Sequence, residues 1–179
     1  KLEQKHKIVL ALLLSAEEPL QEKHVERCLD TEVEMENIVN QLNYDLNRTD
    51  MPFEVQNVAG GYKVVTRARY EPWLNRLLQK SGDPSLSQAA LETLAIVAYT
   101  QPTTKSEIDS IRGVNTSMKT LLDKDLVEVK GRLDAPGRPL LYRTTDQFLE
   151  YFGISSLEEL PKMKEIEELI EEHEEGDET

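Results

Sequence analysis

The first strongly apolar segment of the chain predicts a helix. Residues 8–14 are seven apolar residues in a row. A helix at a protein surface needs only one apolar stripe, whereas this run covers every face of two helical turns. So short a run also fits a strand or a fully buried core helix. The other interpretation is a helix covered on one side by its own domain and on the other by a second copy of the chain, which predicts a dimer interface at Ile8, Leu12 and Leu13.

Two more helices are predicted after this run. Pro19 ends the first helix, because proline lacks the N–H that the helix ladder needs. Residues 21–29 then place apolar side chains on one side, and we expect Cys28 among them, as a small core residue. Asp30 or Thr31 is expected to cap the third helix, and Thr31 with Glu34 has the spacing of a capping box.

A β-hairpin follows these helices. Apolar and polar residues alternate over residues 53–58, Gly60 and Gly61 supply the turn, and residues 62–66 return as the partner strand. The order helix, helix, helix, hairpin is that of a winged helix-turn-helix domain. A further helix over residues 70–79 precedes a stretch of Ser, Gly, Asp and Pro that has the composition of a linker.

The same pattern occurs a second time after the linker. Helices and strands are predicted in the same order over residues 88–99, 105–111, 116–124, 126–129 and 140–144. An offset of 83 residues places Pro19 on Pro102 and Cys28 on Ile111. Cys28 and Ile111 are therefore equivalent positions, and both are expected to face inward. Two copies of one module explain this correspondence. A closing helix, residues 145–152, is expected to pack Phe152 inward.

The expected fold class is therefore α+β and mainly helical. It consists of two tandem winged helix-turn-helix domains and an acidic tail, over residues 1–84, 85–160 and 161–179. The tail carries an apolar stripe, for which we keep two interpretations: a solvated terminus, or a helix that docks in a groove. The stripe consists of Met163, Ile166, Leu169 and Ile170.

The negative charge of the chain is concentrated in this tail. The full sequence has 21 Lys+Arg and 34 Asp+Glu, a net charge of −13. Residues 153–179 hold 2 basic and 11 acidic residues, a net charge of −9, which leaves −4 for residues 1–152. The body of the protein is near neutral, so its overall charge does not favour binding to nucleic acid.

Candidate catalytic chemistry is sparse. The 3 histidines lie in separate segments without a cysteine partner, so we predict no metal site. Phosphate-binding loops and nucleophile elbows are not found in the sequence, so we predict no catalytic residues, no cofactor and no small-molecule substrate. The longest apolar run is far below the roughly 20 residues that cross a bilayer, so no membrane contact is expected. The single cysteine cannot form an internal disulfide, which favours the cytoplasm.

Binding to DNA is the alternative that winged helices raise. The predicted third helix of the first module begins with acidic residues, which would repel phosphates in the major groove. The second module is more mixed, and four of its cations could contact phosphates: Lys119, Lys124, Lys130 and Arg132. A tandem winged-helix transcriptional regulator is therefore the alternative function.

Several motifs resemble those of the segregation and condensation protein B (ScpB) family. They are residues 86–99 (Leu-Ser-Gln-Ala-Ala-Leu-Glu-Thr-Leu-Ala-Ile-Val-Ala-Tyr), Gln101-Pro102, residues 111–115 (Ile-Arg-Gly-Val-Asn), residues 136–142 (Pro-Gly-Arg-Pro-Leu-Leu-Tyr) and residues 148–153 (Phe-Leu-Glu-Tyr-Phe-Gly). In the first module, Glu18-Pro19-Leu20 and residues 58–62 (Val-Ala-Gly-Gly-Tyr) also match, so the resemblance covers nearly the whole chain up to Pro161. Between Asn115 and Thr120 the sequence is shorter than the family pattern.

This resemblance implies a non-enzymatic, dimeric subunit of the bacterial SMC complex, with its dimer formed through the first domain. In that complex ScpB binds the kleisin ScpA, which bridges the SMC ATPase heads, and the complex condenses and segregates chromosomes during cell division. The implied location is the cytoplasm, associated with the nucleoid, and contact with DNA is mostly indirect. For the kleisin surface we expect residues in the turns and wing of the second module: Arg112, Arg138, Tyr142 and Arg143. The alternative is that Arg138 and Tyr142 only brace the wing.

Overall fold

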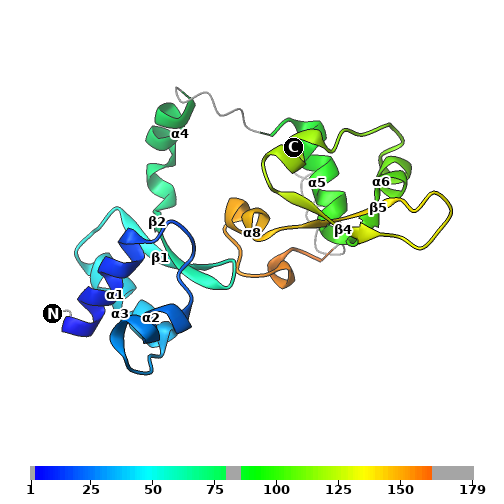
Figure 1. Ribbon diagram of the computed structural model, residues 1–179. Helices are drawn as coiled ribbons and strands as arrows, with labels where there is room; N and C mark the ends of the chain where they lie inside the picture. Colours follow the sequence, from blue (N-terminus) through cyan, green and yellow to red (C-terminus); the bar gives the residue numbers. More distant parts are fainter. Residues whose placement is uncertain (1–2, 80–85, 163–179) are drawn as a thin grey trace.

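The computed structural model describes residues 3–79 and 86–162, which form two halves (Figure 1). Each half has its own cluster of buried side chains, one drawn from residues 9–55 and the other from residues 86–148. The predicted linker and the apolar stripe of the predicted tail lie outside the described residues. Within the described ranges, none of the helices has the length and apolar character of a membrane span.

The N-terminal half contains the predicted order of elements. They are α1 (Gln4–Ser15), α2 (Glu22–Leu29), α3 (Met35–Arg48), β1 (Phe53–Val58), β2 (Gly61–Thr66), the 3-10 helix η1 (Ala68–Tyr70) and α4 (Glu71–Gln79). The centre of the core is formed by Val9 of α1, Val25 of α2, and Met35 and Leu42 of α3, all fully buried. The first apolar run is therefore a helix, as predicted.

The hairpin of this half is tied to the chain that follows α1. Strands β1 and β2 pair antiparallel from Phe53↔Thr66 to Val58↔Gly61. Leu20 and Tyr62 exchange two backbone hydrogen bonds, of 2.8 and 3.0 Å. Gly61 permits this approach, because a Cβ there would lie 2.9 Å from the backbone of Pro19.

The C-terminal half repeats the order with one more strand. Its elements are α5 (Gln88–Thr100), β3 (Thr103–Thr104), α6 (Lys105–Arg112), α7 (Lys119–Asp123), β4 (Val127–Arg132), β5 (Leu140–Thr144), α8 (Asp146–Phe152) and the 3-10 helix η2 (Leu157–Glu159). The antiparallel sheet has the order β3-β5-β4, in which Tyr142 pairs with Thr103 on one side and Val129 on the other. Leu20 occupies the place of Thr103 in the first half, since it lies 83 residues earlier and also pairs with a tyrosine of the returning strand.

The third helix of each half begins later than predicted. The predicted capping box at Thr31 is wrong, because α3 begins at Met35 and side chains of α2 bind the backbone in front of it. Glu22 accepts from the Met35 N–H at 2.9 Å, and Glu26 accepts from the Val33 N–H at 3.3 Å. A capping box is found at α6 instead, where Thr104 and Glu107 bind each other's backbone N–H.

In the second half, α7 begins at Lys119 rather than at residue 116. Asp109 holds Thr116 in the preceding loop, where its carboxylate accepts from the Thr116 N–H at 2.8 Å and from the Thr116 hydroxyl. This interaction keeps residues 113–118 out of the helix, and α7 is left with 5 residues.

Three side chains predicted to be buried lie on the surface instead. Cys28 is exposed, Ile111 is 58% exposed and Phe152 is 45% exposed. Helices α2 and α6 have 8 residues each and bury one, Val25 and Ile108 respectively. Their narrow contact with the core leaves the equivalent positions 28 and 111 outside. Phe152 is the last residue of α8, which buries only one residue, Phe148.

Candidate partner-binding surfaces

The residues predicted for a dimer interface divide between core and surface. Leu13 is 2% exposed and packs into the core of its own half, so it does not contribute to a surface and its assignment is corrected. Ile8 is 38% exposed, and Leu12, one turn later on the same face, is partly buried. Leu14 is more exposed than either and was missed, because an apolar run without a polar interruption does not indicate which face is covered.

An apolar groove lies next to α1. It has a volume of about 400 Å³, and its apolar lining comes from Leu10 of α1, Leu46 of α3, Met51, and Phe53 of β1. Apolar surface of this kind that remains open is typical of protein contacts rather than of catalytic sites. Helix α4 carries two further exposed apolar side chains, Trp73 and Leu77.

Two of the four residues predicted for the partner surface support the fold of the C-terminal half. Tyr142 is 7% exposed and belongs to the core. The Arg112 guanidinium binds Glu92 at 2.6 Å and the Thr93 hydroxyl at 3.2 Å, and thereby joins the end of α6 to α5. Burial and these contacts leave both side chains little capacity for a partner.

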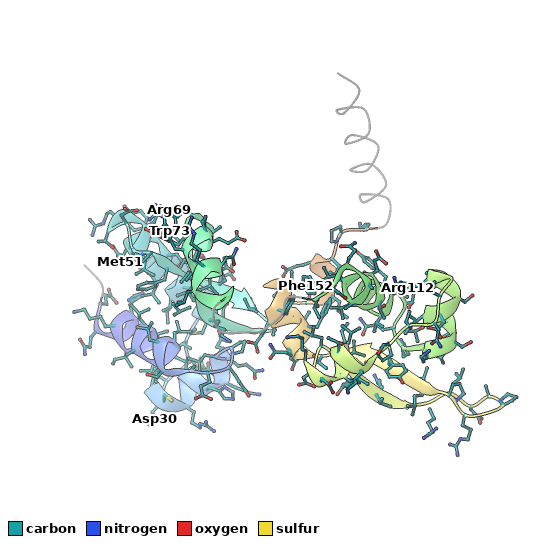
Figure 2. All side chains as sticks on the ribbon, turned by 90° about the horizontal axis from the view of Figure 1, so that it is seen from above. Asp30, Met51, Arg69, Trp73, Arg112 and Phe152 are labelled. Carbon is teal, nitrogen blue, oxygen red and sulfur yellow. The ribbon has the colours of Figure 1, made fainter. Side chains whose placement is uncertain are left out.

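The other two predicted residues are nearer the surface but lie apart. Arg143 of β5 forms an ion pair with Glu128 of β4. Arg138 is exposed in the turn between these strands, with a backbone φ of 41° and its N–H bound to the Ala135 carbonyl at 2.8 Å. Arg112 binds α5, and Figure 2 shows it farther from the N-terminal half than Phe152. The predicted residues therefore divide between the core, the contact of α6 with α5, and the β4–β5 hairpin.

The basic residues predicted for DNA contact lie on or next to two short elements, α7 and β4. Lys119 is exposed at the start of α7, and Lys130 and Arg132 are exposed on β4. Lys124, just after α7, is only partly exposed. Helix α7 is about 7.5 Å long at 1.5 Å per residue, which gives a groove-reading helix little length.

An open polar cleft lies between the two halves, beside the point where they touch. It has a volume of about 530 Å³ and is lined by Glu18, Pro19, Gln21 and Ala59 of the first half and by Asp125, Glu128, residues 143–147 and Glu150 of the second. In the described part of the chain, this lining includes 5 carboxylates and one arginine. Such an acidic surface opposes the approach of nucleic acid.

Polar contacts fix the turn between α6 and α7. The Lys105 ammonium, 2.7 Å from the carboxylate, together with the hydrogen bonds from Thr116, lowers the pKa of Asp109 to about 2. The N–H and hydroxyl of Thr104, at the start of α6, lower the pKa of Glu107.

In the N-terminal half, burial, reinforced by the charges of Glu36 and Glu22, raises the pKa of Tyr62. The pKa shifts of Asp109, Glu107 and Tyr62 thus arise from contacts within the fold. Among the described residues, no group of His, Cys, Asp and Glu could hold a metal ion.

Almost all of the described chain matches one known protein family. The family model described as segregation and condensation complex subunit ScpB matches residues 7–163. The chain belongs to this family.

Individual ScpB proteins match over similar lengths. The segregation and condensation protein B of Clostridium tetani is 40% identical over 177 residues, which are 95% of this chain and 90% of that protein. The protein of the same name from Syntrophotalea carbinolica is 41% identical over 170 residues, 93% of this chain and 86% of its own. The crystal structure of ScpB from Mycobacterium tuberculosis is 31% identical, covers 87% of this chain and 99% of its own, and has a TM-score of 0.40.

Proposed function

We propose that the protein is a non-enzymatic subunit of a condensin-like SMC complex that condenses and segregates chromosomes. The observation that carries this proposal is the match to the ScpB family over residues 7–163. The open surfaces support it, because they are an apolar groove and exposed apolar side chains, which suit contacts with other polypeptides. The protein acts in the cytoplasm, at the nucleoid, and contributes binding surfaces to the complex.

Both halves are winged-helix modules in this proposal. The order of elements and the β3-β5-β4 sheet support it, together with the equivalent pairing of Leu20 with Tyr62. Each module would present its third helix and its hairpin as separate surfaces.

A second copy of the chain covers the face of α1 that carries Ile8 and Leu12, which form the centre of this surface. The apolar groove lined by Leu10 and Phe53 lies on the other flank of α1 and is not part of it. We expect Ile8→Asp with Leu12→Asp to convert the dimer to a monomer, since two carboxylates would be buried without partners. Sedimentation velocity measures the change.

A matched control for this experiment is Asn40→Asp, which adds a carboxylate at an exposed position of α3. It should leave the sedimentation coefficient unchanged. A double variant of α1 that still sediments as the parent dimer would overturn this part of the proposal.

The kleisin ScpA, and through it the SMC ATPase heads, is the proposed partner of the C-terminal half. Arg138 and Arg143 remain as its candidate contacts, because both are at least partly exposed. We expect Arg138→Glu to reduce the amount of ScpA retained in a pull-down, with Lys119→Glu on α7 as the control of equal charge change. Retention that is equal for the parent and both variants would reject Arg138 as a contact.

A further inference from the structure

In the described part of the chain, a side-chain ion pair and a backbone hydrogen bond join the two halves. The Lys63 ammonium of β2 lies 2.6 Å from the Glu150 carboxylate of α8, and these side chains are 33% and 17% exposed. The Ala59 N–H donates to the Ile154 carbonyl at 3.0 Å. Figure 1 shows α8 and the segment after it next to the turn of the first hairpin.

Local structure positions both residues of the backbone hydrogen bond, Ala59 and Ile154. Ala59 is in the turn between β1 and β2, with a φ of 49°. Ile154 follows Gly153, which ends α8 with a φ of 65°, and the Ile154 N–H returns to the Leu149 carbonyl at 3.0 Å. A helix end of this type fixes the direction of the chain that leaves it. Both partners are therefore positioned by elements of their own half.

Among the described residues, every extensive contact between two elements lies within one half, so the halves share no broad element-to-element interface. The space beside the Lys63–Glu150 pair is the polar cleft, to which Ala59 and Glu150 both belong. A small interface that contains a hydrogen bond, an ion pair and an open polar cleft resembles a transient contact, across which the two halves are expected to move.

We propose that Lys63–Glu150 and Ala59–Ile154 form a reversible latch that sets the angle between the two halves. When the ion pair is broken, the C-terminal half leaves the hairpin and the cleft opens. The latch does not depend on the identity of the proposed partners. While it is closed, a partner that contacts both halves meets them in one fixed arrangement. Lys63 and Glu150 are 87 residues apart, so sequence patterns did not reveal the pair.

Carbodiimide coupling tests the closed state directly, because this reagent joins an ammonium and a carboxylate that are already in contact. We expect peptide mass spectrometry to find an amide between Lys63 and Glu150, which is lost in Lys63→Gln. Lys105 and Asp109, 2.7 Å apart within the C-terminal half, serve as the internal positive control. Mixing isotope-labelled and unlabelled chains must show that the Lys63–Glu150 product forms within one chain. Coupling at the control pair without any at Lys63–Glu150 would overturn the latch.

Charge reversal tests whether the latch can open. Energy transfer is measured between dyes on the native, exposed Cys28 and on an added thiol, Ser106→Cys, in labelled chains diluted with unlabelled protein. We expect Glu150→Lys to lower the transfer and a second change, Lys63→Glu, to restore it.

Two controls separate opening of the latch from loss of fold. Glu158→Lys, a charge change of equal size at an exposed position, should leave the transfer at the parent value. Circular dichroism confirms that each variant keeps its helices. Equal transfer in the parent, Glu150→Lys and the double variant would show that the ion pair does not set the angle.

Discussion

At the scale of single residues, neighbouring polar groups determine the behaviour of several side chains. Asp109 is the best example, because one carboxylate binds Lys105 of its own helix and both the N–H and hydroxyl of Thr116. Arg112 has a similar role between α6 and α5. The sequence predicted Arg112 as a partner contact, but its charge is already matched by Glu92.

The pH dependence of stability follows from the lowered pKa of Asp109. The pKa of this carboxyl falls from 3.8 in the unfolded chain to about 2 in the folded protein. Its charge therefore stabilises the folded state fully above pH 3.8, and this stabilisation is lost as the pH falls through about 2. We expect Asp109→Asn to lower the urea midpoint more at pH 6 than at pH 2. An equal difference at both values would show that the charge of Asp109 contributes nothing.

At the scale of elements, caps and strand edges decide where helices and strands begin and how they are joined. The acidic side chains of α2 bind the backbone before α3, so its start depends on another helix rather than on Thr31. Asn43 of α3 closes the edge of β1, because its amide accepts from the Val55 N–H and donates to the Val55 carbonyl, both at 2.8 Å.

Removing the Asn43 amide should destabilise the N-terminal half. Asn43→Ala leaves both backbone groups of the buried Val55 without these partners, at a cost of about 1–3 kcal/mol in the free energy of unfolding. Urea denaturation measures the loss. Asn40→Ala, exposed on the same helix, is the control, and an equal loss in both variants would contradict the assignment.

At the scale of the whole molecule, the distribution of charge opposes tight binding to DNA. The net charge is −13, the cleft between the halves is acidic, and the basic residues predicted for DNA contact lie on or beside the short helix α7 and on β4. The molecule is therefore better suited to protein partners than to a polyanion, even if both halves are winged-helix modules.

We expect the purified protein to bind duplex DNA no more tightly than about 1 μM at physiological salt, which is the range of non-specific contacts. Fluorescence anisotropy at several salt concentrations measures the affinity. Nanomolar affinity with a steep salt dependence, lost in Lys130→Glu with Arg132→Glu, would favour the alternative of a tandem winged-helix regulator.

The sequence by itself determined the order of the helices and hairpins and the repeat offset of 83 residues, but not the short strand β3. Hydrophobic spacing, proline positions and turn glycines act over a few neighbouring residues, so they can be recognised without a fold. The motif similarity also indicated the ScpB family, which the family match to residues 7–163 confirmed.

Only the tertiary structure decided which side chains are covered. Leu13 and Tyr142 are buried while Cys28 and Ile111 are exposed, because each outcome depends on which element packs across from that residue. The contact between Lys63 and Glu150 likewise depends on how two distant segments meet. Burial and long-range pairing are properties of the packed chain, whereas the elements themselves are largely properties of local sequence.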